Sequence, residues 1–337
     1  MNMKISVCYI VKDEEKKLRQ SLESLNNAAD EIIIVDTGSI DGTLDVAEKF
    51  GAKIFNEVWQ EDFSLPRNVA LSHATGDWII FLDADEYFTE ATAKNIRLVL
   101  EKFNPTKVNG LMTYLVNVDA DDNNRILDST FLLRIFRNLR GLAYVGKIHE
   151  ELRLNGQDLT NLMALPPKFL TLVHTGYSES LNKSKAERNL KMILQEFYTT
   201  NTPQKFYGYL AQCYNGLDDF DNAKKYARLD IEYNAERPDF SSSSFRILLS
   251  ILSRDKFNLY ERTKIARQAA EKFCDQPDFH AELAECFAAQ GNFESAVESM
   301  STALEKYKTY KGIETSVFND ALAYVAKQRI NDWRKKI

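Results

Sequence analysis

The hydrophobic and polar residues of the first half of the chain form a repeating pattern of short apolar runs and amphipathic segments. Three short strand-like runs, at residues 5–11, 31–36 and 52–55, are each followed by a segment with apolar residues at helical spacing. A fourth apolar run, residues 78–82, ends in three acids and is typical of a buried parallel strand. Strands and helices that alternate in this way predict a parallel sheet with right-handed crossovers.

Between residues 110 and 151 the pattern changes to strands that follow one another directly. Apolar runs predict strands at 111–116, 131–137 and 144–148. An acidic loop at 119–124 lies between the first two. This loop lacks the glycine and the distal Glu of a calcium-binding loop, so we interpret it as a solvated hairpin tip.

The second half of the chain has no strand signals and consists of successive amphipathic helical patterns. Six residues of one segment recur 73 positions later, close to twice the roughly 34-residue tetratricopeptide period. They are Leu210, Ala211, Cys213, Tyr214, Phe220 and Ala223, which recur as Leu283, Ala284, Cys286, Phe287, Phe293 and Ala296. The spacing leaves room for one divergent unit between the two copies. We therefore predict an all-α domain of tetratricopeptide-like helix pairs over residues 183–337, closed by a helix in which Trp333 packs.

Composition agrees with two soluble domains. A chain of 337 residues is too long for one ordinary hydrophobic core. An apolar content of 44% and a charged content of 27% are typical of a globular protein. The net charge of -6 argues against a nucleic-acid partner, because binding to phosphates requires a basic surface.

The cysteines and the longest apolar runs bear on the location of the protein. Four cysteines occur without any Cys-x-x-Cys spacing, so we expect reduced thiols and a cytoplasmic protein. No run approaches the roughly 18 apolar residues of a membrane span, and no long apolar segment follows the amino terminus. We therefore expect neither a membrane span nor a signal peptide.

The three acids after the fourth strand form the first candidate site. Asp83 and Asp85 are separated by one residue at the carboxyl end of a predicted parallel strand, which is the edge of an α/β sheet where ligands bind. Carboxylates at this spacing can share a hard divalent cation with a polyphosphate. A polar turn that ends a strand is the alternative, and Glu86 has no predicted role.

The loop after the second strand is also acidic. Asp36 ends that strand and Asp41 follows a glycine turn, but neither of the glycine-rich phosphate-binding motifs is present. These carboxylates either hold a nucleotide base or ribose or belong to a turn that starts a helix.

Five blocks of residues occur in the order expected of one family. They are Ile-Val-Lys-Asp-Glu at 10–14, Asp-Glu-Ile-Ile-Ile-Val-Asp-Thr-Gly-Ser-Ile-Asp-Gly-Thr at 30–43, Trp59 with Asp62-Phe63-Ser64, Arg67-Asn68, and Gly-Asp-Trp through Asp-Ala-Asp-Glu at 76–86. The chain resembles glycosyltransferase family 2, in the branch in which a GT-A catalytic domain precedes tetratricopeptide repeats. The resemblance implies an α/β GT-A domain with a Rossmann-like, mainly parallel sheet over residues 1–182. Asp13 departs from the family, which usually has Asn before the Glu.

The resemblance implies an inverting transfer of a sugar from a nucleotide diphosphate, with Mg²⁺ or Mn²⁺ as the cation. Asp85 would bind the cation, Asp83 the donor's ribose with a share in the cation site, and His174 would complete the coordination. The implied donor-binding residues are Val11, Asp13, Glu14, Asp36, Arg67, Asp83, Lys185 and Arg188. The three basic residues of the 183–188 segment, Lys183, Lys185 and Arg188, are expected to close over the diphosphate as a lid. The alternatives are a core or loop role for His174, a surface role for Arg67 and a solvated helix start at 183–188.

The catalytic base is expected in the motif His149-Glu150-Glu151. An inverting transfer needs a group that takes the acceptor's proton on the face opposite the leaving group. The resemblance places the base-bearing motif of the family here, with Glu150 as the first candidate and Glu151 as the second. A pair of exposed acids at a strand end is the alternative.

For the substrates, the resemblance favours a UDP-sugar of glucose or a similar hexose and a peptide or protein acceptor. The combination of domains is similar to bacterial enzymes that glycosylate Cys or Ser of bacteriocin peptides. One alternative is a cell-surface glycan or lipid-linked acceptor. Another, of a different class, is a non-catalytic scaffold whose repeats bind a partner. We also expect the helical repeats to support a homodimer.

Overall fold

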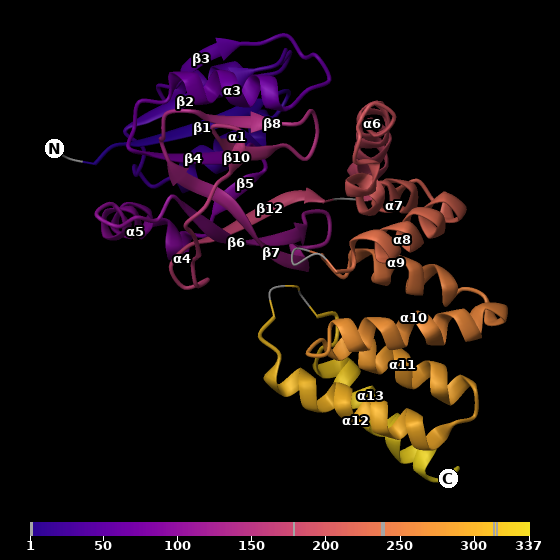
Figure 1. The fold of residues 1–337 in the computed structure, drawn as a ribbon. Helices are drawn as coiled ribbons and strands as arrows, with labels where there is room; N and C mark the ends of the chain where they lie inside the picture. Colours follow the sequence, from indigo (N-terminus) through magenta and orange to yellow (C-terminus); the bar gives the residue numbers. More distant parts are fainter. Residues whose placement is uncertain (1–2, 178, 237–239, 313, 315) are drawn as a thin grey trace. The chain divides into compact units, whose positions relative to one another are not determined.

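The computed structural model describes residues 3–177, 179–236, 240–312, 314 and 316–337. The chain divides into two compact units, Met1–Leu181 and Asn182–Ile337, which are α/β and α-helical, respectively (Figure 1). This is the predicted fold class, a mostly parallel curled sheet followed by a run of helices.

Among the residues that the structure describes, nine strands of the first unit form one sheet in the order β3-β2-β1-β4-β7-β6-β12-β5, with β11 beside β6. The strands are β1 (Ile5–Val11), β2 (Glu31–Asp36), β3 (Lys53–Asn56), β4 (Trp78–Asp83), β5 (Glu86–Phe88), β6 (Gly110–Asp119), β7 (Arg125–Arg137), β11 (Leu162–Ala164) and β12 (Thr171–Tyr177). The first four are parallel to one another, whereas β7 is antiparallel to β4 and β6. A second small sheet contains β8 (Leu142–Val145), β9 (Glu151–Leu154) and β10 (Gln157–Asp158).

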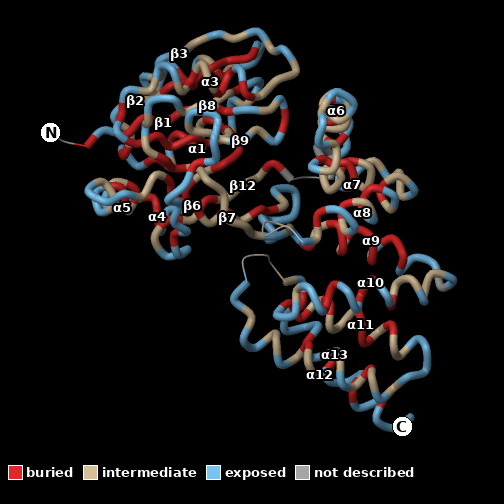
Figure 2. Tube along the Cα trace, viewed as in Figure 1, coloured by how far each residue is buried: buried red, intermediate tan, exposed pale blue. Residues whose placement is uncertain are grey.

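Both faces of the parallel strands are covered, as their continuous apolar sequences require. In β1, Val7 and Tyr9 pack in the cluster that contains apolar residues of α1, α2 and α5, whereas Cys8 packs in the cluster that contains Ala70 of α3 and Tyr144 of β8. β1, β2 and β4 are mostly buried, whereas β3 at the edge of the sheet is more exposed (Figure 2). The helices are α1 (Glu15–Ser24), α2 (Thr43–Lys49), α3 (Ser64–His73), α4 (Glu90–Ala93) and α5 (Ile96–Phe103).

The register of the sheet brings three strand ends to one edge. Val11 is paired with Asp36 and Ile10 with Asp83, so β1, β2 and β4 end together. The chain then turns through Asp85 into β5, which pairs antiparallel with β12. The acids that follow the predicted fourth strand therefore lie at the carboxyl edge of the sheet, beside β12.

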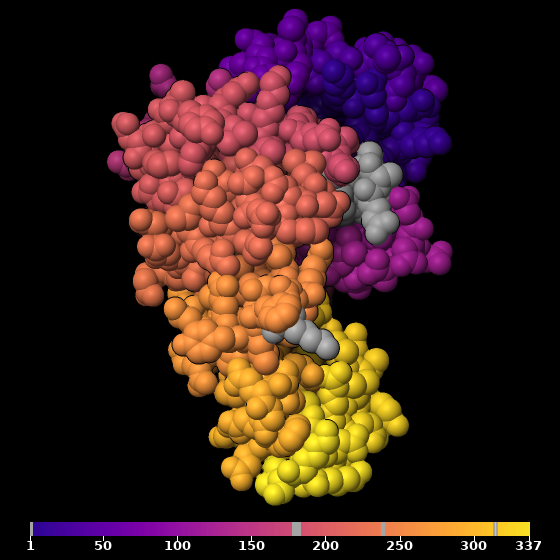
Figure 3. Space-filling view, turned by 90° about the vertical axis from the view of Figure 1, so that its right-hand side faces the viewer, coloured from indigo at the N-terminus to yellow at the C-terminus, as the bar shows by residue number. Residues whose placement is uncertain are grey.

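The second unit is a series of helices in which each of α8 to α13 packs against the helix before it (Figures 1 and 3). Its elements are α6 (Glu179–Phe197), η1 (Pro203–Phe206), α7 (Tyr207–Gly216), α8 (Phe220–Asn234), α9 (Ser243–Leu252), η2 (Lys256–Asn258), α10 (Leu259–Lys272), α11 (Pro277–Ala289), α12 (Phe293–Thr309) and α13 (Asp320–Arg334). The recurring residues fall on α7–α8 and α11–α12, with α9–α10 between them. Trp333 is buried in α13, as predicted. The assignment of the pairs to the tetratricopeptide type stays a prediction.

Several local predictions differ from the structure. The strand predicted at 144–148 ends at Val145, because Gly146 and His149 have positive φ angles of 104° and 53° that an extended strand cannot contain. The polar segment 183–188 lies inside the long helix α6. The short strands β9, β10 and β11 were not predicted. In the described ranges, no helix combines the length and the apolar character needed to cross a membrane.

Candidate active site

The position of Arg67 is fixed by the start of α3. Asp62 Oδ1 accepts hydrogen bonds from Ser64 N and Oγ at 2.8 and 2.6 Å, and this satisfies groups at the start of the helix that have no intrahelical partner. Arg67 follows one turn later and is buried. Its guanidinium lies 4.8 Å from the ring centroid of Phe81 and 5.4 Å from that of Tyr144. The arginine is therefore part of the interior, and the surface alternative does not apply.

The next residue, Asn68, fixes β8 against α3. Its Nδ2 donates to Tyr144 O at 2.9 Å and its Oδ1 accepts from Tyr144 N at 2.7 Å. These paired bonds keep the ring of Tyr144 on the guanidinium of Arg67.

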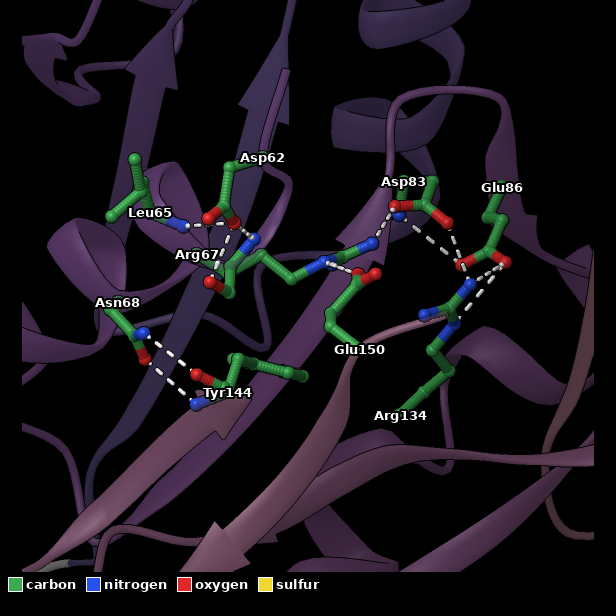
Figure 4. A network of polar contacts seen from close by, with 10 residues as sticks. Asp62, Leu65, Arg67, Asn68, Asp83, Glu86, Arg134, Tyr144 and Glu150 are labelled. Carbon is green, nitrogen blue, oxygen red and sulfur yellow. Dashed lines mark hydrogen bonds and ion pairs between the residues drawn. The ribbon is translucent and has the colours of Figure 1, made fainter. Parts of the chain in front are cut away.

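Five side chains of alternating charge form a continuous chain of ion pairs (Figure 4). Arg67 pairs through Nε with Glu150 and through Nη2 with Asp83 Oδ1, the latter at 2.8 Å. Arg134 Nη2 pairs with Asp83 Oδ2 at 2.7 Å and with Glu86 Oε1 at 2.5 Å. Residues from α3, β4, β5, β7 and the loop before β9 thus converge on Asp83.

The charges of Arg67 and Arg134 affect the protonation of the acids with which they pair, Asp83 and Glu86. Burial would raise the pKa of Asp83, but the charges of Arg134 and Arg67 outweigh burial and hold this pKa well below its usual range. Glu86 is 1% exposed, and burial raises its pKa despite the charge of Arg134. Asp83 is therefore an ionised acceptor whose two oxygens both face arginines. Its predicted role as a cation ligand stays a prediction.

Asp85 lies beside His174. The two side chains approach to 3.4 Å between Oδ2 and Nε2, and Thr175 N donates to Asp85 O at 3.0 Å. On the other side of the ring, His174 Nδ1 is 2.7 Å from Asn117 Oδ1, while the Nδ2 of the same amide donates to Asp128. Because an amide oxygen accepts, Nδ1 carries a hydrogen and Nε2 is the nitrogen turned toward Asp85.

This orientation is the one that a metal-binding histidine adopts. A hydrogen bond that holds one ring nitrogen fixes the direction in which the other nitrogen points, as in histidines that bind a cation. Burial lowers the pKa of His174, but the hydrogen bond and charge of Asp85 outweigh burial, and the pKa is raised. With no cation bound, a charged imidazole in this position stabilises the Asp85 carboxylate.

The donor set fits a cation that takes part of its coordination from substrate. Over the described ranges, no three His, Cys, Asp or Glu side chains are grouped so that they hold a metal by themselves. One carboxylate and one imidazole suit Mn²⁺ better than Mg²⁺, and phosphate oxygens and water can supply the remaining ligands of such a cation.

At the neighbouring strand ends, acids organise the loops. Asp36 accepts from Gly38 N at 3.0 Å and from Ser39 N at 3.1 Å. Asp13, at φ 54°, accepts from Ile40 N at 2.7 Å, which ties the loop after β1 to the loop after β2. Asn favours the left-handed conformation and offers the same oxygen, so the departure from the family at Asp13 preserves this contact.

The remaining predicted residues of this edge contribute backbone contacts or caps. Val11 O accepts from Thr37 N at 2.9 Å, and Glu14 N donates to Thr43 Oγ1 at 2.8 Å. Asp41 caps α2 by accepting from Thr43 N at 2.9 Å, as in the helix-start alternative. Their contacts with a nucleotide stay predictions.

Not every predicted residue joins the cluster around Asp83. Glu151 is 64% exposed at its side chain and pairs with Arg153 at 2.5 Å, and His149 is also exposed. Lys185 and Arg188 lie on α6 in the second unit, so their role as a lid stays a prediction.

Four contributors to the site were missed by the sequence analysis, namely Glu86, Asn117, Arg134 and Tyr144. Arg134 interrupts the apolar run Phe131 to Phe136. A charged residue within a run of this kind is a signal of a buried partner. Asn117 gives a weaker signal of the same type in β6, whereas no sequence feature distinguishes Tyr144.

Together, the sheet order and the acidic carboxyl edge define an α/β domain of the GT-A class. Residues 6–144 match the family model described as Glycosyl transferase family 2. The greater part of the first unit is therefore similar to glycosyl transferase family 2, in agreement with the predicted resemblance.

Comparison with curated proteins identifies relatives of part of the chain. Over 190 residues, 54% of this chain and 42% of the relative, it is 29% identical to the SPbeta prophage-derived glycosyltransferase SunS of Bacillus subtilis. Over 82 residues, 24% of this chain and 20% of the relative, it is 49% identical to a TPR repeat-containing protein of Synechococcus elongatus. The chain thus matches less than half of the length of these relatives. A crystal structure of S. aureus TarS 1-349 aligns with 94% of this chain and 97% of that chain, at 15% identity and a TM-score of 0.38.

Proposed function

We propose that the protein is a metal-dependent, inverting glycosyltransferase that moves a hexose such as glucose from a UDP-sugar to a Cys or Ser side chain of a peptide. The observation that carries the proposal is the pair of Asp85 and His174, 3.4 Å apart, beside an arginine-held Asp83 at the carboxyl edge of a family 2 domain.

In this proposal, Asp83, Asp85 and His174 form the part of the site that binds the sugar donor. Asp85 and His174 Nε2 would hold the cation, which when bound stabilises the negative charge that develops on the departing diphosphate. Asp83 is ionised and fixed by two arginines, so it presents an oriented acceptor to a ribose hydroxyl. A fixed acceptor of this kind reduces the ordering cost of donor binding.

Glu150 is the residue proposed to act on the acceptor. In the proposed reaction, Glu150 takes the proton of the acceptor thiol or hydroxyl while the sulfur or oxygen bonds to the anomeric carbon. The bond from that carbon to the diphosphate breaks on the opposite face, UDP leaves, and the configuration inverts. The ion pair with Arg67 holds the Glu150 carboxylate in one orientation.

A peptide acceptor is supported by the combination of a family 2 domain with an array of helix pairs. Arrays of this type present extended surfaces on which a polypeptide can lie.

Isothermal titration with UDP tests the proposal in the presence and absence of Mn²⁺. We expect binding that strengthens with Mn²⁺, and loss of the Mn²⁺-dependent part in Asp85→Ala. Asp158→Ala is the matched control, because this side chain is 82% exposed. Wild-type protein that binds UDP equally with and without Mn²⁺, or not at all, would contradict the proposed chemistry.

A further inference from the structure

The first and third helix pairs of the second unit differ at one buried contact. The 73-residue offset relates Gly208 and Asp230 of α7–α8 to Ala281 and Ala303 of α11–α12. Ala303 is fully buried in an apolar cluster against which Ala281 packs. The third pair thus shows that two alanines suffice for this helix contact.

In the first pair a buried carboxylate takes the place of that alanine. Asp230 is 8% exposed, and it accepts from Asn234 Nδ2 at 2.7 Å and from Ser244 Oγ at 2.6 Å. Both donors are neutral, and in the part of the chain that the structure describes no cation pairs with Asp230. A buried carboxylate without a counter-charge is costly, so packing alone does not account for it.

The absence of a side chain at Gly208 leaves the Asp230 carboxylate accessible. A Cβ at position 208 would lie 3.0 Å from Asp230 Oδ2, closer than side chains normally approach. Without it, Asp230 borders a pocket of about 130 Å³. The pocket is lined by Lys205, Gly208, Tyr209, Gln212, Asp230, Asn234, Phe240 and Ser241.

We propose that this pocket binds the cationic end of a Lys or Arg side chain of a partner polypeptide. The two neutral donors leave lone pairs of the Asp230 carboxylate available, and these accept from an ammonium or guanidinium group. Pockets for complete small molecules have volumes of about 300–1,000 Å³, so this one takes the end of a single side chain. Lys205 Nζ lies over the ring of its neighbour Phe206, 4.6 Å from the centroid, and so has a partner other than Asp230. The inference is independent of the proposed transfer reaction.

The test is fluorescence anisotropy with the full chain and three labelled peptides. The peptides are glycine pentamers, acetylated and amidated, in which the central residue is arginine, lysine or norleucine. We expect the arginine and lysine peptides to bind at least about tenfold more tightly than the norleucine peptide, a difference of about 1.4 kcal/mol. Agmatine, which carries the guanidinium without a peptide, is the competitor.

The comparison of the first and third helix pairs suggests the variants for this test. Asp230→Ala installs the residue that the third pair already has and is expected to fold, whereas Gly208→Ala places a Cβ against the retained Asp230 carboxylate. Each is expected to weaken binding of the arginine peptide about tenfold or more. Asp221→Ala removes the same charge from the same helix at a 96% exposed side chain and is expected to leave binding unchanged.

Four results would overturn the inference. They are equal binding of the norleucine peptide, wild-type affinity in Asp230→Ala, absence of binding of both basic peptides at millimolar concentration, and agmatine affinity equal to that of the arginine peptide. The last result would assign the pocket to a free amine. If UDP fails to bind while the basic peptides do, the proposed function is wrong and the pocket assignment stands.

Discussion

Arg134 is the residue on which the charge balance of the acidic edge depends. It lies between Asp83 and Glu86, and its guanidinium pairs with both. Without it, the buried Glu86 would lose the cation with which it pairs, and Arg67 would be the remaining cation in contact with the half-buried Asp83. Removing one member of a buried ion pair leaves an uncompensated charge, which costs far more than the loss of a surface pair.

Arg134→Met is therefore expected to lower the free energy of unfolding by about 3–5 kcal/mol. Adding Glu86→Gln to the same chain is expected to restore part of this loss, because it removes the unpaired buried carboxylate. Urea unfolding followed by circular dichroism measures both. Arg125→Met, on the same strand but 59% exposed, is the control and is expected to change stability by at most about 1 kcal/mol. A loss in Arg134→Met no larger than that of the control would show that the pairs are not buried in solution.

Glu150 and Glu151 are adjacent acids with different surroundings. Glu150→Gln is expected to reduce sugar transfer by about 10²–10⁴-fold with UDP binding unchanged, because a general base contributes about this much. Glu151→Gln is the matched control, since that side chain is exposed and pairs with Arg153. Mass spectrometry of a pool of Cys- and Ser-containing peptides measures transfer. Near-normal transfer by Glu150→Gln would exclude this residue as the base.

Part of the charged cluster around Asp83 was predicted from the sequence, and the reason is physical. Asp83 and Asp85 follow an apolar strand directly, so local pattern places them at a sheet edge. The contact of Arg134 with Asp83 joins residues 51 positions apart and depends on the antiparallel pairing of β4 with β7. No local pattern encodes that pairing, and for this reason Arg134 and the role of Glu86 were missed.

At the scale of elements, Glu31 joins four parts of the first sheet. Its carboxylate accepts from Ser6 Oγ on β1 at 2.6 Å, from Lys53 Nζ on β3 at 2.7 Å and from Thr75 N before β4 at 2.6 Å. Burial raises the pKa of Glu31, but these hydrogen bonds outweigh burial and lower it from 4.5 to about 2. The parallel strands thus share one ionised acceptor near their amino ends.

A pH dependence of stability follows from this shift. A lowered folded-state pKa adds stability above the unfolded value of 4.5, and this stability is lost as pH falls toward about 2. Glu31→Gln is expected to reduce stability at pH 7 and to flatten the decline between about pH 4.5 and 2. Thermal unfolding across this range measures the effect. Glu48→Gln, at an exposed site, is the control, and an unchanged pH profile in Glu31→Gln would contradict the assignment.

The sequence predicted those helices and strands that have a recognisable hydrophobic period. The strands β1 to β4 and the helices of the second unit have long, regular apolar patterns. In contrast, β9, β10 and β11 contain two to four residues each, too few for a period to be recognised. The end of β8 depends on backbone angles at Gly146 and His149, and of these two residues, glycine alone gives a sequence signal.

At the scale of the whole molecule, each of the two compact units contains hydrophobic clusters of its own. The last core contains Trp333 of α13 with apolar residues of α11 and α12. In an array, each helix pair is stabilised mainly by its neighbours, so damage at the final helix affects the second unit first.

Trp333→Ala is expected to lower the stability of the second unit by about 3–5 kcal/mol, because it leaves a cavity in this core. UDP binding is expected to remain unchanged, since Asp83, Asp85 and His174 lie in the first unit. Urea unfolding and titration with UDP measure the two effects. Tyr324→Ala, 66% exposed on the same helix, is the control. Loss of UDP binding in folded Trp333→Ala would show that the units are energetically coupled.

Asp230 and Ala303 occupy corresponding positions in the first and third helix pairs, and the difference between them shows how a repeated contact can diverge. Because an array has more than one copy of the same helix contact, one copy can keep the arrangement that folds best while another diverges, and the cost of divergence stays local. The third pair is thus a starting point for engineering, in which Ala281→Gly combined with Ala303→Asp introduces the glycine and the carboxylate of the first pair at a second position in the array.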